Sequence, residues 1–270
     1  MKNQLKIILI LVCLLANIFY TTTLFAKPAQ VVIVIDDMGY RSTDKQALTL
    51  PRQVTFAFLP HTPYGKKLAL AAQAQKNDVL LHIPMEATNG KLLGPGALTS
   101  SMNQQEIQQS LAESFAEIPF AIGINNHMGS YLTQLDEPMI WTMKFLKARQ
   151  LFFLDSLTST QSKAAQVAKD IGVPVKARHI FLDNTLTDEY ISRQFDNLIQ
   201  YAKKNLTAIA IAHPHPKTVE MLTKLIPTLK KHNIELVPLS SLYIENKIAR
   251  LSNKVSAKTE VSLRGDEDDE

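Results

Sequence analysis

The strongest constraint on the fold comes from residues 31–39, which read VVIVIDDMG. Five consecutive Val and Ile residues run into two adjacent carboxylates, Asp36 and Asp37. An apolar run without polar alternation is typical of a strand buried on both faces, as in parallel sheets covered by helices. Ligands of such folds bind at the carboxyl ends of the strands, where both aspartates fall. The pair could instead cap a turn, but adjacent like charges usually require a metal or a proton.

The rest of the chain repeats a unit made of a short apolar strand and a helical segment. We expect strands at 31–35, 54–59, 79–83, 121–124, 151–154, within 173–181, 208–212 and 234–238. We expect helices at 68–76, 103–117, 138–149, 162–170, 188–204 and 217–232, with a shorter one after Ser42. This alternation indicates an α/β fold with a parallel sheet. Eight units predict a single-domain β/α barrel, closed or incompletely closed, and an open doubly wound sheet is the alternative.

The two ends of the chain differ from this repeating body. Residues 1–26 place two lysines before an apolar run and end on a small residue, which predicts a secretory signal peptide. The single cysteine, Cys13, lies inside that segment, so any metal in the exported part must use His, Asp or Glu. The predicted domain covers residues 27–243. Residues 244–270 are polar, end in five acidic residues and are expected to be disordered.

Charge and hydropathy narrow the choice of partners. The formal net charge is only +4, and no basic cluster with interleaved aromatic residues marks a nucleic-acid site. After the signal, no run of about 20 apolar residues remains, so no integral membrane span is expected. The mildly basic body would suit an anionic envelope polymer as a partner, but a positive charge spread over many solvated helices is the favoured interpretation.

Polar residues that could act in catalysis or bind a ligand gather at the ends of the predicted strands. In chain order they are Asp36 and Asp37, His61, His82 with Glu86, Asn125 to His127, Asp155 and Ser156, Asp183 and Asn184, and His213 with His215. Five of the seven histidines belong to this set. A single histidine at a strand end is more often structural. For His82 and His127 we favour a functional role, because the rigid turn elements Pro84 and Gly129 follow them.

Imidazoles and carboxylates around an open position form the ligand set of a catalytic zinc or similar divalent ion. Such an ion lowers the pKa of bound water and polarises a carbonyl. No Gly-rich phosphate loop and no G-x-S-x-G elbow is present, which disfavours phosphate binding and serine-hydrolase chemistry. A glycosidase with two carboxylates, Asp36 or Asp37 with Asp155 or Glu86, is an alternative that leaves the histidines unexplained.

Several of these segments together resemble the divergent polysaccharide deacetylases, distant relatives of the carbohydrate-esterase deacetylases. The matching segments are IDDMG at 35–39, LPHTP at 59–63, LHIPME at 81–86, NHMGS at 126–130, FLDS at 153–156, FLDN at 181–184 and AIAHP at 210–214. The resemblance implies a deacetylase-type barrel, an envelope location and removal of N-acetyl groups from a polysaccharide.

The resemblance also implies a role for each matching residue. Asp37, His82 and His127 would bind a divalent metal, most simply zinc, while Asp36 would act as general base and His213 as general acid. The residues expected to support these groups or contact substrate are His61, Glu86, Asn126, Asp155 and Asp183. The better-known deacetylases take both metal histidines from one segment, four residues apart, whereas here Glu86 stands four residues after His82. This departure keeps open a non-catalytic module that binds glycan or protein.

Overall fold

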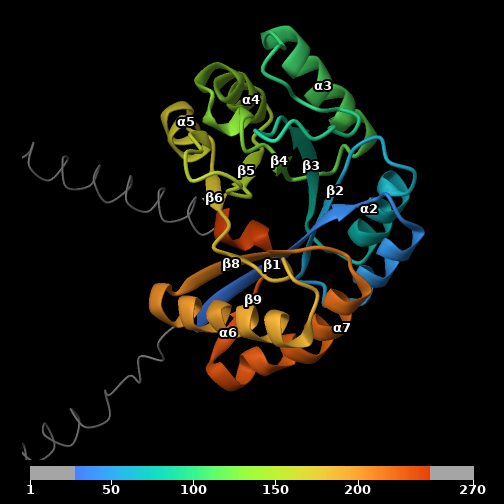
Figure 1. Ribbon diagram of the computed structural model, residues 1–270, viewed down its shortest axis with the longest axis vertical. Coiled ribbons are helices and arrows are strands. Elements are labelled where there is room, and N and C mark those ends of the chain that lie inside the picture. The colour runs from blue at the N-terminus through green and yellow to red at the C-terminus, as the bar shows by residue number, and fades with distance from the viewer. Residues whose placement is uncertain (1–27, 244–270) are drawn as a thin grey trace, which may run out of the picture.

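A computed structural model describes residues 28–243, which form a curled parallel sheet with helices on its outer face (Figure 1). The strands are β1 (Ala29–Met38), β2 (Thr55–Phe58), β3 (Val79–Met85), β4 (Gly123–Met128), β5 (Phe152–Asp155), β6 (Val175–Ala177), β7 (Ile180–Phe181), β8 (Thr207–Ala212) and β9 (Ile234–Leu236). The helices are η1 (Ser42–Thr49), α2 (Gly65–Ala74), α3 (Gln104–Glu117), η2 (Leu132–Gln134), α4 (Asp136–Ala148), α5 (Ala164–Ile171), α6 (Asp188–Asn205), α7 (Pro216–Leu225) and η3 (Ile226–His232).

The order of the strands explains why the sheet curls. Neighbours follow the order β6-β5-β4-β3-β2-β1-β8-β7, and β9 pairs with the start of β1. All of these pairings are parallel. The two ends of the order, β6 and β7, are joined by only Arg178 and His179. Because so short a connection spans at most about 3.6 Å per residue, the sheet must bend until its ends nearly meet. The predicted β/α barrel is confirmed in its incompletely closed form.

Alternate residues of each strand face two separate cores. Val31, Ile33 and Ile35 pack with residues of the surrounding helices in the larger core. Val32 and Val34 pack with other strand residues and with the segment 237–243 in a smaller core inside the curl. Side chains alternate along a strand. The residue two positions beyond the last inner-core residue of a strand therefore points into the mouth of the curl.

The expected strands and helices are all present, with two differences in the second half of the chain. The single strand expected within 173–181 is two short strands, β6 and β7, because Arg178 and His179 bridge the opening of the barrel. The single helix expected at 217–232 ends as an α-helix at Leu225 and continues as the 3-10 helix η3. Pro227 lies at the start of η3, and a proline lacks the N–H that would continue the α-helical ladder.

The predicted signal peptide and the predicted acidic tail lie outside the described residues. Among helices built from residues 28–243, none has both the length and the apolar character needed to cross a membrane.

Candidate metal centre

Two carboxylates from the end of β1 reach the mouth of the curl. Asp36 follows Val32 and Val34 on the inner face and is 2% exposed. Regular alternation would turn Asp37 toward the outer helices. Instead, its backbone is left-handed, with φ 57°, and the β1–β2 register shifts between Ile35 and Met38. Aspartate tolerates this conformation better than most residues, so the irregularity brings two adjacent carboxylates to one site.

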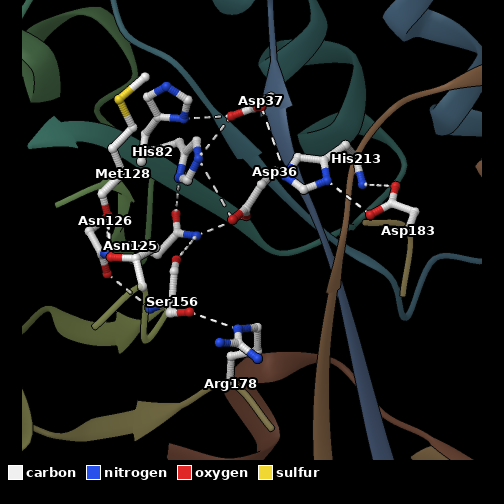
Figure 2. Close-up of polar contacts among 12 residues, drawn as sticks. Asp36, Asp37, His82, Asn125, Asn126, Met128, Ser156, Arg178, Asp183 and His213 are labelled. Atoms are coloured by element: carbon white, nitrogen blue, oxygen red, sulfur yellow. Dashed lines mark hydrogen bonds and ion pairs between the residues drawn. The ribbon is translucent and has the colours of Figure 1, made fainter. Parts of the chain in front are cut away.

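Asp37 meets two histidines from neighbouring strands, as Figure 2 shows. Its Oδ1 lies 3.1 Å from His82 Nε2 and 2.7 Å from His127 Nδ1. His82 comes from β3 and His127 from β4, and the register pairs His82 with Asn125 and Pro84 with His127. One face of this strand pair therefore carries both histidines. The potential ligand atoms of Asp37, His82 and His127 all lie within 4.8 Å of one another.

Asn125 joins the histidine pair to the other carboxylate. Its Nδ2 donates to Asp36 Oδ1 at 2.8 Å, which fixes the orientation of the amide. The amide oxygen Oδ1 then accepts from His82 Nδ1–H at 2.9 Å. A histidine protonated at Nδ1 presents the lone pair of Nε2, which is the form that binds metal. Asn125 is fully buried, so it sets the tautomer of His82 and the position of Asp36 together.

The residues fit a divalent cation. The Nε2 lone pair of neutral His82 faces Asp37 Oδ1, and two acceptors at 3.1 Å repel unless a proton or a cation lies between them. Burial lowers the pKa of His82, but the charge of Asp36 and the hydrogen bond that a second proton on Nε2 would make to Asp37 outweigh burial and raise that pKa. Two imidazoles and one carboxylate match the three protein ligands of catalytic zinc sites, which keep a further position open.

The two aspartates differ in their electrostatic surroundings. Burial raises the pKa of Asp36, and this effect outweighs the nearby charges of His82 and His213. Burial also acts to raise the pKa of Asp37, but the hydrogen bonds and charges of His127 and His82 in their protonated forms outweigh it and lower that pKa strongly. Asp37 therefore stays ionised and can act as a ligand, while Asp36 binds a proton more readily. Such divergent values within one carboxylate pair are typical of separate chemical roles.

His213 faces Asp37 from the opposite side of the site (Figure 2). Its Nε2 lies 3.9 Å from Asp37 Oδ2, and its Nδ1 lies 2.9 Å from Asp183 Oδ1. The other oxygen of Asp183 accepts from the His213 backbone N–H and from the Thr218 hydroxyl. Burial lowers the pKa of His213, but the hydrogen bond and charge of Asp183 raise it to about 9. His213 is thus held in a fixed orientation and protonated near neutral pH.

Four of the residues named from the sequence have their hydrogen-bond partners outside the group formed by the two aspartates and three histidines. The Nδ1 of His61 is 3.1 Å from Glu117 Oε2, and Glu86 accepts from the Ser100 N–H. Asn126 accepts from the Ser156 N–H and donates to the Met128 carbonyl. Asp155 accepts from the Leu157 N–H and from the Ser162 hydroxyl. None of these side chains is hydrogen-bonded to Asp36, Asp37, His82, His127 or His213 in residues 28–243, and their expected contact with substrate stays a prediction.

Strand alternation distinguishes Asn126 and Asp155, which were given a role from the sequence, from their neighbours Asn125 and Ser156, which were not. Asp155 follows Phe153 and Asn126 follows Ile124, and both apolar residues belong to the outer core. The residues one position away, Ser156 and Asn125, share the inner face and contact each other at 3.3 Å. The spacing of two between Asn125 and His127 was the signal that could have found Asn125 from the sequence.

Arg178 was also missed, and its role depends on the barrel opening. Its guanidinium donates from Nε to the Ser156 carbonyl and from Nη2 to the Leu157 carbonyl. The same group lies over the Phe181 ring, 3.7 Å from its centroid. Arg178 therefore ties β5 to β7 across the gap, and no sequence pattern reveals such a contact.

Replacement of Asn125 by alanine is expected to weaken metal binding by about 10- to 100-fold, the usual effect of losing a group that orients a metal ligand. The reason is that His82 loses the acceptor that holds its proton on Nδ1. Zinc affinity measured by competition with a chelating dye checks this. Asn126→Ala on the same strand is the matched control, and equal affinities for the two variants would contradict the assigned role of Asn125.

Comparisons with known proteins identify the family and the fold of this chain. The family model described as divergent polysaccharide deacetylase matches residues 33–243. The uncharacterized protein YibQ of Escherichia coli (strain K12) is 36% identical over 220 residues, covering 81% of this chain and 69% of that protein. The crystal structure of an uncharacterized protein from Agrobacterium tumefaciens C58 is similar with a TM-score of 0.77 and 27% identity, covering 81% of this chain and 90% of that one.

A more distant solved structure shares the fold alone. It is the catalytic domain of peptidoglycan N-acetylglucosamine deacetylase from Eubacterium rectale ATCC 33656, with a TM-score of 0.52 and 14% identity, covering 79% of this chain and 90% of that one. The resemblance inferred from the sequence motifs and the predicted type of fold are therefore both confirmed.

Proposed function

Since this chain belongs to the divergent polysaccharide deacetylase family, we propose that it is a metal-dependent hydrolase that removes N-acetyl groups from a polysaccharide of the cell envelope. The observation that carries the proposal is the convergence of Asp37, His82 and His127 beside a buried carboxylate and a protonated histidine. The N-terminal segment predicted to be a signal peptide supports export, and we propose the periplasm as the location.

Hydrolysis of an amide needs a base for the attacking water and an acid for the leaving nitrogen. Asp36 suits the first task because it is buried with a raised pKa and is oriented by Asn125. His213 suits the second because Asp183 keeps it protonated and fixes its ring. The two groups approach the site from different strands, so a substrate bound between them would meet a base on one side and an acid on the other.

Asp37, His82 and His127 would hold the metal, and zinc fits this donor set. A bound divalent ion supplies Lewis acidity, which polarises the acetyl carbonyl and lowers the pKa of water. Asp37 remains ionised for ligation because its pKa is low, and Asn125 keeps the Nε2 lone pair of His82 available.

The pH dependence of turnover follows from His213. An acid with a pKa of about 9 is protonated below that pH and loses its proton above it, so the rate is expected to fall as the pH rises through about 9. Asp183→Asn removes the carboxylate charge that raises this pKa, so the fall is expected at lower pH. The pH profile of kcat/KM for the two proteins checks this, and an unshifted profile would contradict the assignment of His213 as the acid.

Acetate release from purified N-acetylated envelope polysaccharide tests the proposed function. The zinc-loaded protein is expected to release acetate repeatedly, and the chelated protein is expected to release none. Binding to the polysaccharide without acetate release would instead favour a non-catalytic binding module. New reducing ends in place of acetate would favour the glycosidase, and either result would overturn the proposal.

A further inference from the structure

A small cavity adjoins the candidate metal centre and carries groups that the chemistry above does not use. Its volume is about 130 Å³, and it is lined in part by Asp37, His127 and His213. The other lining residues include Tyr40, Arg41 and His215. Small-molecule pockets usually measure about 300 to 1,000 Å³, so this cavity holds one substituent of a sugar ring and not a whole saccharide.

Arg41 brings an available positive charge to this cavity. Its side chain is exposed, and no ion pair to it occurs within residues 28–243. The two carboxylates that also line the cavity have other partners. Asp37 interacts with the histidines, and the buried Asp44 accepts from the N–H groups of Gly39 and Arg41.

The backbone that carries Arg41 is held in place. The two hydrogen bonds to Asp44 Oδ2, at 2.9 and 3.0 Å, fix the turn between β1 and η1. Gly39 in this turn has φ 125°, and a Cβ there would approach the Thr62 hydroxyl oxygen to 2.3 Å. The turn that positions Asp37 for ligation therefore also positions Arg41 at the cavity, a few residues further along the chain.

We infer that Arg41 forms a subsite for a carboxylate on the substrate, so that the preferred substrate is an N-acetylated amino sugar that bears a carboxylate near its acetamido group. A guanidinium binds a carboxylate through two parallel N–H···O bonds. A doubly charged phosphate suits this cavity less well, because Asp37 and Asp44 lie on its walls. The half-exposed ring of Tyr40 offers an apolar face on which the sugar can lie. The inference rests on the proposed function, because it assumes that the acetamido group occupies the metal centre.

The test compares two ligands that differ only in charge. One is an oligomer of N-acetylglucosamine, and the other is the same oligomer with an ether-linked carboxylate on each ring. Isothermal titration calorimetry with the zinc-loaded protein is expected to show about tenfold tighter binding of the carboxylated oligomer, the effect of one charge-assisted pair. Arg41→Gln is expected to abolish this preference and to leave binding of the neutral oligomer unchanged.

Arg52→Gln is the matched control, because it removes an exposed arginine that does not line the cavity. It is expected to retain the preference. Equal binding of both oligomers to the wild type, or equal weakening of both by Arg41→Gln, would overturn the inference. Acetate release measured in parallel separates the two proposals. Preferential binding of the carboxylated oligomer without acetate release would contradict the proposed reaction alone. Acetate release without that preference would contradict the carboxylate subsite alone.

Discussion

Asp36→Asn is expected to reduce acetate release by about 100- to 10,000-fold, the usual contribution of a positioned general base. An asparagine at this position can still accept the hydrogen bond from Asn125 Nδ2 through its own amide oxygen. It cannot take a proton from water. Metal content should stay at the wild-type level, because Asp37, His82 and His127 remain in place. Steady-state acetate release and elemental analysis on the same sample check both statements.

The stability of this variant separates loss of chemistry from loss of fold. Burial raises the pKa of Asp36, so the ionised group is less favourable in the folded state than in the unfolded one. Its contribution therefore lowers stability as the pH rises above the ordinary pKa of aspartate. Replacement by neutral asparagine is expected to keep or raise Tm at neutral pH. Glu86→Gln, which changes a strand-end carboxylate bonded to Ser100, is the control and should keep full activity. Wild-type turnover in Asp36→Asn would remove Asp36 from the reaction.

His127→Ala is expected to lower the affinity for zinc by more than about 100-fold, because even groups that only orient a ligand contribute 10- to 100-fold. The change removes a ligand atom 2.7 Å from Asp37 Oδ1. The side chain is partly exposed, so little core packing is lost. Activity should fall to background at zinc concentrations that saturate the wild type. Competition with a chelating dye gives the affinity.

His61→Ala is the matched control for that loss. His61 also follows a strand and is partly exposed, but its imidazole interacts with Glu117 away from the metal centre. Its replacement is expected to leave zinc affinity unchanged. If both variants bind zinc as the wild type does, His127 is not a ligand. If both lose zinc equally, the loss does not report on the site.

Much of the fold could be predicted from the sequence because the buried strands are runs of consecutive apolar residues. The apolar runs of β1 and β8 each lie between two other strands of the sheet, and the carboxyl ends of parallel strands must meet at one edge. That reasoning was enough to gather Asp37, His82 and His127, and to bring Asp183 to His213. It was not enough to sort neighbouring polar residues by face. Asn126 and Asp155 were preferred over Asn125 and Ser156, although strand alternation distinguishes them.

Other features depend on local backbone geometry that propensities do not encode. Asp37 reaches the site only because its φ is positive and the strand register shifts there. Regular alternation would have placed Asp36 and Asp37 on opposite faces. Similarly, the contact of Arg178 with Ser156 exists because the chain crosses the opening between β6 and β7. Both features arise from tertiary structure and become visible only once the barrel is assembled.

The central claim is that Asp37, His82 and His127 form a metal centre, and a crystal structure of the zinc-loaded protein tests it most directly. We predict an anomalous difference peak between the Asp37 carboxylate, His82 Nε2 and His127 Nδ1, with ligand distances of about 2.0–2.2 Å. A crystal with full zinc occupancy elsewhere and no peak among these three side chains would contradict the claim.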